Sequence, residues 1–141
     1  MRMICGSPET FPNYLFDGRE EDVIEIIKAG NTILKYQAQV NEAACKGAFE
    51  HEFEGLRFIC LNGGGFSSDV FKSVYDESKH DGMMPFKYDG KNKQWVISMY
   101  GTKDIDLSLI AKKWGGGGHK QACGMQVKDI TKIFPNININ E

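Results

Sequence analysis

Four consecutive glycines, followed by a histidine and a lysine, constrain this chain more than any other part of its sequence. They lie in residues 114–124, which read WGGGGHKQACG. Each glycine loses more backbone freedom on folding than any other residue, so four together are costly unless the fold or a ligand requires them. A linker does not usually lead from a tryptophan directly into His-Lys. The stretch is therefore a hinge, a turn, or a place where the backbone must closely approach another molecule.

A run of glycines allows successive backbone N–H groups to converge on one anion, because no Cβ atom blocks the approach. We expect residues 119–122 to form a new helical turn, whose first N–H groups would point to the same place. His119 can then donate a hydrogen bond to a phosphate oxygen or stack on a base, with Lys112, Lys113 and Lys120 raising the local potential. This interpretation predicts a site for a phosphodiester or a nucleotide phosphate. The alternative is a tight turn between two helices with a histidine on the surface.

If the backbone contacts the anion, Gly116→Val or Gly117→Val should impair ligand binding more than folding, because a side chain would block the approach. Gly63 to Gly65 form the other glycine run. This second run lacks the GK[ST] ending of a P-loop, so a turn is the better interpretation. If this second run does form a phosphate-binding cleft, Ser67 and Ser68, which follow it, can line that cleft.

The composition is that of a soluble globular protein, with 141 residues, 41% hydrophobic and 26% charged. The formal net charge of -2 provides no general attraction for nucleic acid, so any anion site must be local. The four cysteines are scattered without a CxxC pair, which favours buried thiols over a zinc site. We find no signal peptide and no run of about 20 apolar residues, so we expect a cytoplasmic protein with no membrane partner.

No arrangement of residues in the sequence predicts catalysis. It contains no HxxxH, no cysteine cluster and no defensible Ser-His-Asp or Cys-His spacing. His51 lies between glutamates at a predicted helix end, and His80 lies in a predicted loop. We therefore predict a binding site without catalytic residues and without metal ligands.

The hydrophobic pattern divides the chain into four parts. Residues 1–18 show no regular period and predict an irregular arm. Residues 19–54 keep helical spacing and predict one long helix, which either connects two domains or packs along its own domain. Residues 55–128 alternate strands and helices and predict an α/β domain with a small β-sheet flanked by helices. Residues 129–141 predict a tail that frays after Pro135.

Within the α/β domain the local signals are stronger. Residues 56–62 predict a strand, and Ser67 or Ser68 can cap a helix over 69–78. Residues 89–92, Asp-Gly-Lys-Asn, predict the turn of a hairpin. A short amphipathic helix is expected over 107–114 and a last strand over 124–127.

Residues 104–124, DIDLSLIAKKWGGGGHKQACG, resemble the signature segment of the DHH-associated domain (DHHA1). Cys123 replaces an alanine of that segment, and the resemblance extends over most of residues 19–128. In this family the domain is the C-terminal half of phosphoesterases such as RecJ-like nucleases, nano-RNases and cyclic-dinucleotide hydrolases. The resemblance implies a small mixed β-sheet after a long connector helix.

The resemblance also implies roles for individual residues. Gly115, Gly116, Gly117, Gly118 and His119 would grip the terminal phosphate and base of the substrate. Many members carry an arginine on the preceding strand, where this chain has Ser98-Met99-Tyr100-Gly101. Tyr100 can stack on a base, and Lys103 can replace the missing charge.

The sequence contains no DHH motif, so we expect the two manganese ions of the family only in an absent DHH half, and no cofactor here. The leading hypothesis is a substrate-binding domain, inactive alone, for a short single-stranded oligonucleotide or a nucleotide. Its protein partner would be a DHH catalytic domain or a second copy of the chain. The alternatives are a stand-alone single-stranded nucleic-acid binding module, or a scaffold that works through its long helix.

Overall fold

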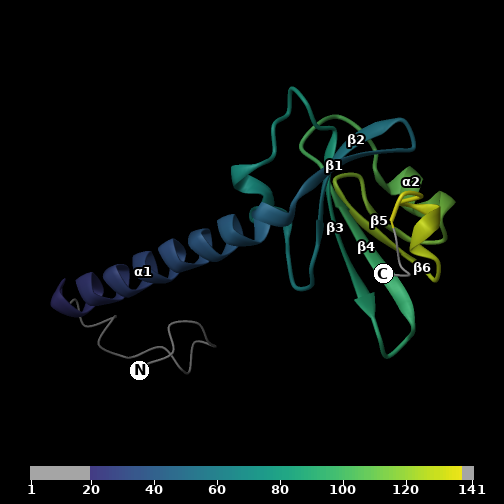
Figure 1. Ribbon diagram of the computed structural model, residues 1–141. Helices are drawn as coiled ribbons and strands as arrows, with labels where there is room; N and C mark the ends of the chain where they lie inside the picture. Colours follow the sequence, from purple (N-terminus) through teal and green to yellow (C-terminus); the bar gives the residue numbers. More distant parts are fainter. Residues whose placement is uncertain (1–19, 138–141) are drawn as a thin grey trace. The chain divides into compact units, whose positions relative to one another are not determined.

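The computed structural model describes residues 20–137, and the predicted arm over 1–18 lies outside them. The chain divides into two compact units, one ending at Val40 and one beginning at Asn41. Helix α1 spans Glu20–Ala44 (Figure 1). Its first turn carries Glu20, Glu21 and Asp22, which suit the positive end of the helix dipole. None of its residues is buried.

The long helix ends earlier than predicted, so the helix expected over 19–54 is wrong at its C-terminal end. After Ala44 a short 3-10 helix, Cys45–Gly47, leads into strand β1, Phe49–Phe53. This strand pairs antiparallel with β2, Leu56–Asn62, through a two-residue turn in which Glu54 and Gly55 have φ of 53° and 78°. Aromatic and acidic residues alternate over 49–53, and this period of two places Phe53 in the core.

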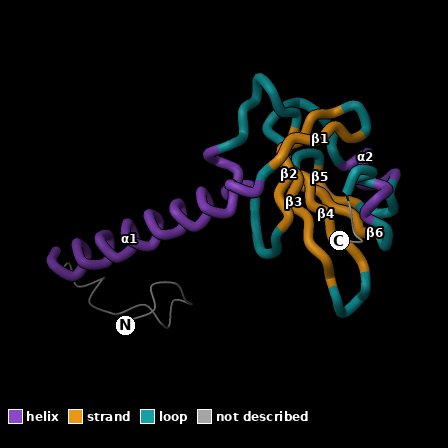
Figure 2. Tube along the Cα trace, viewed as in Figure 1, coloured by secondary structure: helices purple, strands orange, loops and turns teal. Residues whose placement is uncertain are grey.

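The second unit is built on one mixed sheet of six strands in the order β1-β2-β3-β4-β6-β5 (Figure 2). The β2–β3 pair is parallel and the other four pairs are antiparallel. The predicted strand over 56–62 and the predicted hairpin around 89–92 are both confirmed. The remaining strands are β3, Gly82–Asp89; β4, Gln94–Tyr100; β5, Gly117–His119; and β6, Ala122–Val127.

The connection from β2 to β3 contains a 3-10 helix, Ser68–Ser73, in place of the α-helix expected over 69–78. Ser67 caps it as predicted, because its hydroxyl accepts the Asp69 N–H at 3.4 Å. The 3-10 form buries Val70 and Phe71 against the sheet. It then leaves the remainder of the segment free to form the turn around Asp76.

One face of the sheet carries the main core and is covered by α2, Ser108–Lys113, and by the C-terminal segment. The helix predicted over 107–114 is confirmed, and Leu107 and Ala111 are fully buried. The predicted tail contributes to this core, because Ile130, Ile133 and Phe134 around the 3-10 helix Ile130–Lys132 are buried. Residues 129–137 therefore belong to the folded unit.

The opposite face is only partly covered. Ile59, Leu61 and Met83 on β2 and β3 pack there against the segment that holds Val70 and Phe71. In the part of the chain that the structure describes, no such cluster of buried side chains covers this face over β4, β6 and β5. We call this surface the open half of the sheet. Its residues are Val96, Ser98 and Tyr100 of β4, Ala122, Gly124 and Gln126 of β6, and Gly117 and His119 of β5.

Candidate functional site: the open half of the sheet

The first two glycines of the run end helix α2. Gly115 has φ of 83°, and its N–H donates to the Lys112 carbonyl at 3.1 Å. The Gly116 N–H donates to the Ala111 carbonyl at 2.7 Å. These two bonds form the Schellman motif that commonly closes a helix before a left-handed glycine. The N–H groups of Gly115 and Gly116 are therefore used inside the fold and do not point to an anion.

Gly116 and Gly118 allow the loop to lie directly on β6. A Cβ atom at Gly116 would be 2.1 Å from the Gly124 carbonyl oxygen. Gly118 has φ of 133°, and a Cβ there would be 2.6 Å from the Cys123 Cα. Both positions therefore require glycine for packing, whatever the loop binds.

Gly117 is the exception within the run. A Cβ at Gly117 would have no atom within 4 Å, and its φ is not positive. It pairs with Gly124, which in turn pairs with Ser98. Directly paired residues share a face of a sheet, so Gly117 and Gly124 expose bare backbone beside Ser98 on the open half. This is the place where a ligand can reach the main chain.

His119 ends strand β5 and does not begin a helical turn, so the helix predicted over 119–122 is wrong. Residues 120 and 121 form the turn of the β5–β6 hairpin. The Lys120 and Gln121 carbonyls accept the N–H groups of Leu107 and Gly101 at 2.9 and 3.0 Å. The His119 side chain is exposed, and it makes no hydrogen bond or ion pair within residues 20–137.

Tyr100 and His119 lie on the same face. Tyr100 pairs with Ala122, and Ala122 pairs with His119, so the two side chains stand two strands apart, roughly 10 Å. Tyr100 is half-buried at the edge of the cluster around Met83, and His119 is exposed. The small side chain of Ala122 separates them. The open half thus presents small residues between the aromatic ring of Tyr100 and the imidazole of His119.

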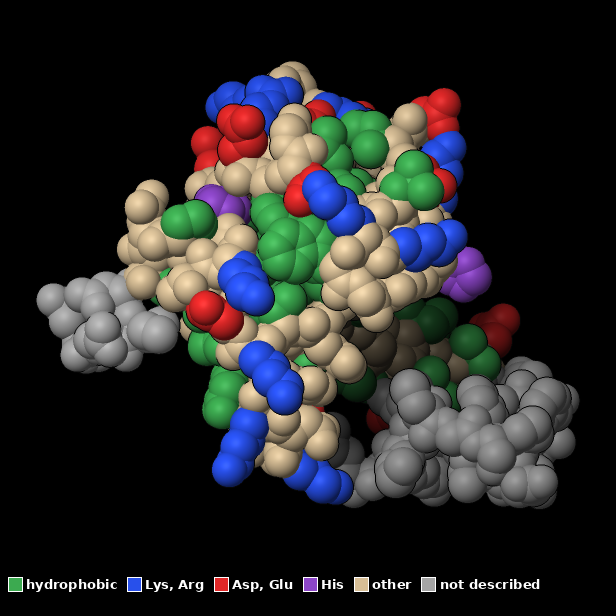
Figure 3. Space-filling model, turned by 90° about the vertical axis from the view of Figure 1, so that its right-hand side faces the viewer, with side chains coloured by type: hydrophobic (Ala, Val, Ile, Leu, Met, Phe, Trp, Pro, Cys, Tyr) green, Lys and Arg blue, Asp and Glu red, His purple; other side chains and the backbone are tan. Residues whose placement is uncertain are grey.

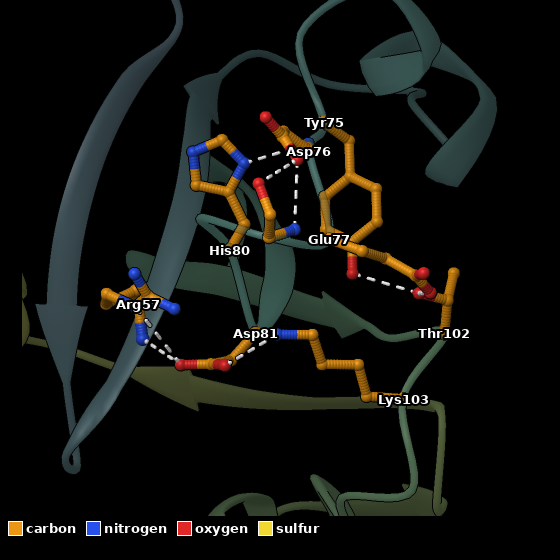
Figure 4. A network of polar contacts seen from close by, with 9 residues as sticks. Arg57, Tyr75, Asp76, Glu77, His80, Asp81, Thr102 and Lys103 are labelled. Atoms are coloured by element: carbon orange, nitrogen blue, oxygen red, sulfur yellow. Dashed lines mark hydrogen bonds and ion pairs between the residues drawn. The ribbon is translucent and has the colours of Figure 1, made fainter.

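Lys103 lies just after β4, but its charge is already engaged. Its ammonium is 3.0 Å from one oxygen of Asp81, whose other oxygen accepts the Arg57 N–H at 2.9 Å (Figure 4). The Arg57 N–H and the Lys103 ammonium lower the pKa of Asp81 below its ordinary value. Lys120 is likewise paired with Asp104. Neither lysine offers an unpaired charge to a ligand in this arrangement.

Sequence reasoning missed Ser98, Ala122 and Gly124 as neighbours of the glycine run. Only the register of the sheet reveals that Ser98, Gly124 and Gly117 form one row. The one feature of the sequence that could have indicated these neighbours was the run of small residues Ala-Cys-Gly at 122–124, shortly after His119. That signal indicates close packing but not which face the small residues share.

The described residues include no group of three or more His, Cys, Asp or Glu side chains arranged to hold a metal ion. The described residues therefore do not fit the manganese site of a DHH half, and no chemical step is assigned to a metal here. No helix within residues 20–137 is both long enough and apolar enough to cross a membrane. The thiols of Cys45, Cys60 and Cys123 are buried and unpaired as predicted, and burial raises the pKa of Cys60 to about 12.

No protein-family model matches the sequence, and no curated protein matches it significantly. The structure is similar to PggH, a pGpG-specific phosphodiesterase from Vibrio cholerae, with a TM-score of 0.52 and 13% identity. That match covers 79% of this chain and 38% of PggH. An uncharacterized protein from Helicobacter pylori G27 matches with a TM-score of 0.47 and 15% identity, over 86% of this chain and 36% of that chain.

The match to PggH shows a shared fold. The long N-terminal helix and the six-stranded mixed sheet have the α/β architecture that the resemblance to the DHH-associated domain implied. This chain spans less than two fifths of the length of PggH.

Proposed function

We propose that this chain binds a short single-stranded oligonucleotide or a nucleotide on the open half of the sheet. The observation that carries the proposal is the position of Gly117. It is the one glycine of the run that the fold does not require, and it lies bare on an open face two residues from His119. A glycine at such a place is explained by a ligand that approaches the backbone closely.

The side chains around Gly117 suit a nucleotide. The exposed His119 imidazole can donate an N–H to a phosphate oxygen. The Tyr100 ring offers a surface on which a base can stack, a contact worth about 1–3 kcal/mol per base in single-stranded complexes. Ser98, Ala122 and Gly124 between them leave room for the sugar and phosphate to lie against the sheet.

Hydrolysis, on this proposal, requires a metal-bearing DHH half that is not part of this sequence. The similarity in fold to a pGpG phosphodiesterase supports a relationship to nucleotide phosphoester chemistry. The chain by itself is then a substrate-binding domain and is inactive alone. Manganese-dependent release of mononucleotides by this chain without a partner would contradict that part of the proposal.

The test is a titration of the dinucleotide pApA against the wild type, His119→Ala and Gly117→Val, with unfolding followed in parallel. We expect each variant to bind at least about tenfold more weakly. Each should unfold at a similar temperature, because the exposed His119 side chain makes no hydrogen bond or ion pair within residues 20–137 and a Cβ at position 117 meets no atom within 4 Å. Gly90→Val is the control. A Cβ at Gly90 would be 3.9 Å from Tyr88 and its φ is not positive, so it adds the same bulk in the β3–β4 turn.

If the wild type does not bind pApA, or if both variants bind like the wild type, the open half is not a nucleotide site. The hypothesis that then remains is the scaffold, in which the glycine run serves only to pack the β5–β6 hairpin against β6.

A further inference from the structure

A hollow adjoins the open half on the same face of the sheet. It is a cavity of about 220 Å³, lined among others by Gly63, Gly65, Phe66, Lys87 and Ser98. Ser98 belongs both to this cavity and to the row that contains Gly124 and Gly117. The cavity and the open half are therefore continuous along the sheet.

The glycine run at 63–65 shapes this cavity. The Gly63 N–H donates to the Phe86 carbonyl at 2.8 Å, which holds the loop beside β3. A Cβ at Gly63 would be 2.3 Å from the Phe66 ring, and Gly65 has φ of 75°. Both glycines are thus required for the loop to fold back and present Phe66 as an apolar wall. Residues 63–65 form a turn, as expected, and the turn creates a hollow.

Lys87 lies along this loop. A Cβ at Gly64 would be 3.1 Å from the Lys87 Cδ and 4.0 Å from its Nζ, so the lysine chain rests on the bare backbone of Gly64. Lys87 pairs with Val96 on β4, which places its side chain on the face of the open half. The arrangement holds an ammonium group at the cavity.

The charge of Lys87 has no ion-pair partner among residues 20–137, whereas Lys103, Lys113 and Lys120 are each paired with a carboxylate. Asp89 stands two residues away on the same strand, and the pKa of its carboxyl is lowered mainly by hydrogen bonds from Asn92, with the charge of Lys87 the smallest contribution. The Asp89 oxygens, however, accept hydrogen bonds from Lys91 and Asn92. The hydroxyl of Ser98 also makes no hydrogen bond within the described residues. An unpaired ammonium and a hydroxyl in one hollow are suited to an anion.

Lysines concentrate in this part of the molecule. Lys87, Lys91 and Lys93 are exposed on the β3–β4 hairpin. In Figure 3, basic side chains gather at the lower end of the molecule, where Figure 1 places this hairpin. The sequence has a net charge of -2, so this local excess of lysine provides the positive potential that an anionic ligand would need.

We propose that the cavity is a second phosphate subsite, in which Lys87 and Ser98 bind another phosphate of the ligand held by Gly117 and His119. The inference rests on the proposed function. Gly117 lies two strands from Ser98 and three from Lys87, which is roughly 10 to 14 Å at the usual strand spacing. That separation exceeds the reach of one nucleotide. The preferred ligand is therefore an oligonucleotide long enough for two of its phosphates to span this distance, with Phe66 contacting a base or sugar.

The experiment compares AMP, pApA and pApApA as ligands of the full chain. In the wild type the affinity should rise with length once the second phosphate reaches the cavity. Lys87→Met keeps an unbranched side chain over Gly64 but removes the charge. In this variant the increase in affinity from AMP to pApApA should be about tenfold smaller than in the wild type, and the affinity for AMP should be unchanged. The slope of affinity against salt for the longest ligand should decrease by about 1.

Lys91→Met is the matched control, because it removes the same charge from the same hairpin outside the cavity and so measures the part of the loss that comes from the general positive potential alone. The second subsite is refuted if Lys87→Met binds each of the three ligands as tightly as Lys91→Met does. If His119→Ala weakens the binding of all three at the same time, the open half is still supported as a nucleotide site. If Lys87→Met weakens AMP as strongly as pApApA, the cavity is the only phosphate site and the two-site arrangement is refuted. If the wild type binds none of the ligands, the proposed function itself has failed.

Discussion

The four glycines from 115 to 118 are identical in the sequence and different in the structure. Gly115 has the left-handed backbone that closes α2, and Gly116 and Gly118 lie too close to β6 for any side chain. Of the four, only Gly117 has both open space for a Cβ atom and a φ that is not positive. The structure therefore changes the expectation for Gly116→Val. That substitution should damage the fold, and only the Gly117 variant isolates a contact with a ligand.

This difference can be measured on stability alone. Gly116→Ala should lower the free energy of unfolding by about 1–3 kcal/mol, because its methyl group would overlap the Gly124 carbonyl. Gly117→Ala should leave it unchanged or raise it by up to about 1 kcal/mol, since it restricts the unfolded chain without strain. Urea unfolding of both variants beside the wild type tests this. Equal destabilisation would show that the loop does not pack on β6 as described.

At the scale of elements, Asp81 joins three segments that are distant in the sequence. Its carboxylate accepts the Arg57 N–H from β2 and binds the Lys103 ammonium from the segment after β4 (Figure 4). The Asp81 N–H donates to the Arg57 carbonyl at 2.7 Å. The preceding turn is held by the buried His80, whose Nδ1 accepts the Asp76 N–H at 3.0 Å. Its Nε2–H therefore donates to Glu50.

This network makes a pH dependence predictable. The folded-state pKa of Asp81 lies below its ordinary value of 3.8, so its contribution to stability is present above that pH. The contribution is lost as the pH falls through the lower, folded-state pKa. Asp81→Asn should cost about 1–2 kcal/mol at pH 7 and flatten the loss of stability in acid. Urea unfolding between pH 7 and pH 3 measures both effects, and an unchanged acid profile in the variant would contradict the assignment.

At the scale of the whole molecule, the two units differ in how they bury apolar side chains. The core clusters of the second unit enclose all the large buried side chains that the structure describes, whereas α1 buries none. Several apolar residues of α1 are exposed, among them Ile27, Leu34 and Tyr36. The predicted partner, a DHH catalytic domain or a second copy, stays a prediction, and these side chains are the ones that such a partner would cover.

Because the chain divides into two compact units between Val40 and Asn41, we predict that the second unit folds without the first. A chain of residues 41–141 should melt cooperatively within a few degrees of the full chain, because removing residues 1–40 takes away none of the described buried side chains. Circular dichroism and thermal melting of both chains measure this. A lower melting temperature by more than about 8 °C would show that the first unit stabilises the second by over 1 kcal/mol.

The sequence by itself determined the α/β class, the strand at 56–62, the hairpin around 89–92 and the short helix before the glycine run. Each of these depends on a local pattern of apolar residues, caps or turn residues. Only the tertiary structure decided that 49–53 is a strand, that His119 ends one, and that Lys103 is held by Asp81. It also decided which glycine is open and that Ser98, Tyr100, Gly117 and His119 share a face. The physical reason is that sheet register is set by pairing between distant segments, and a shift of one residue would send every one of these side chains to the other face.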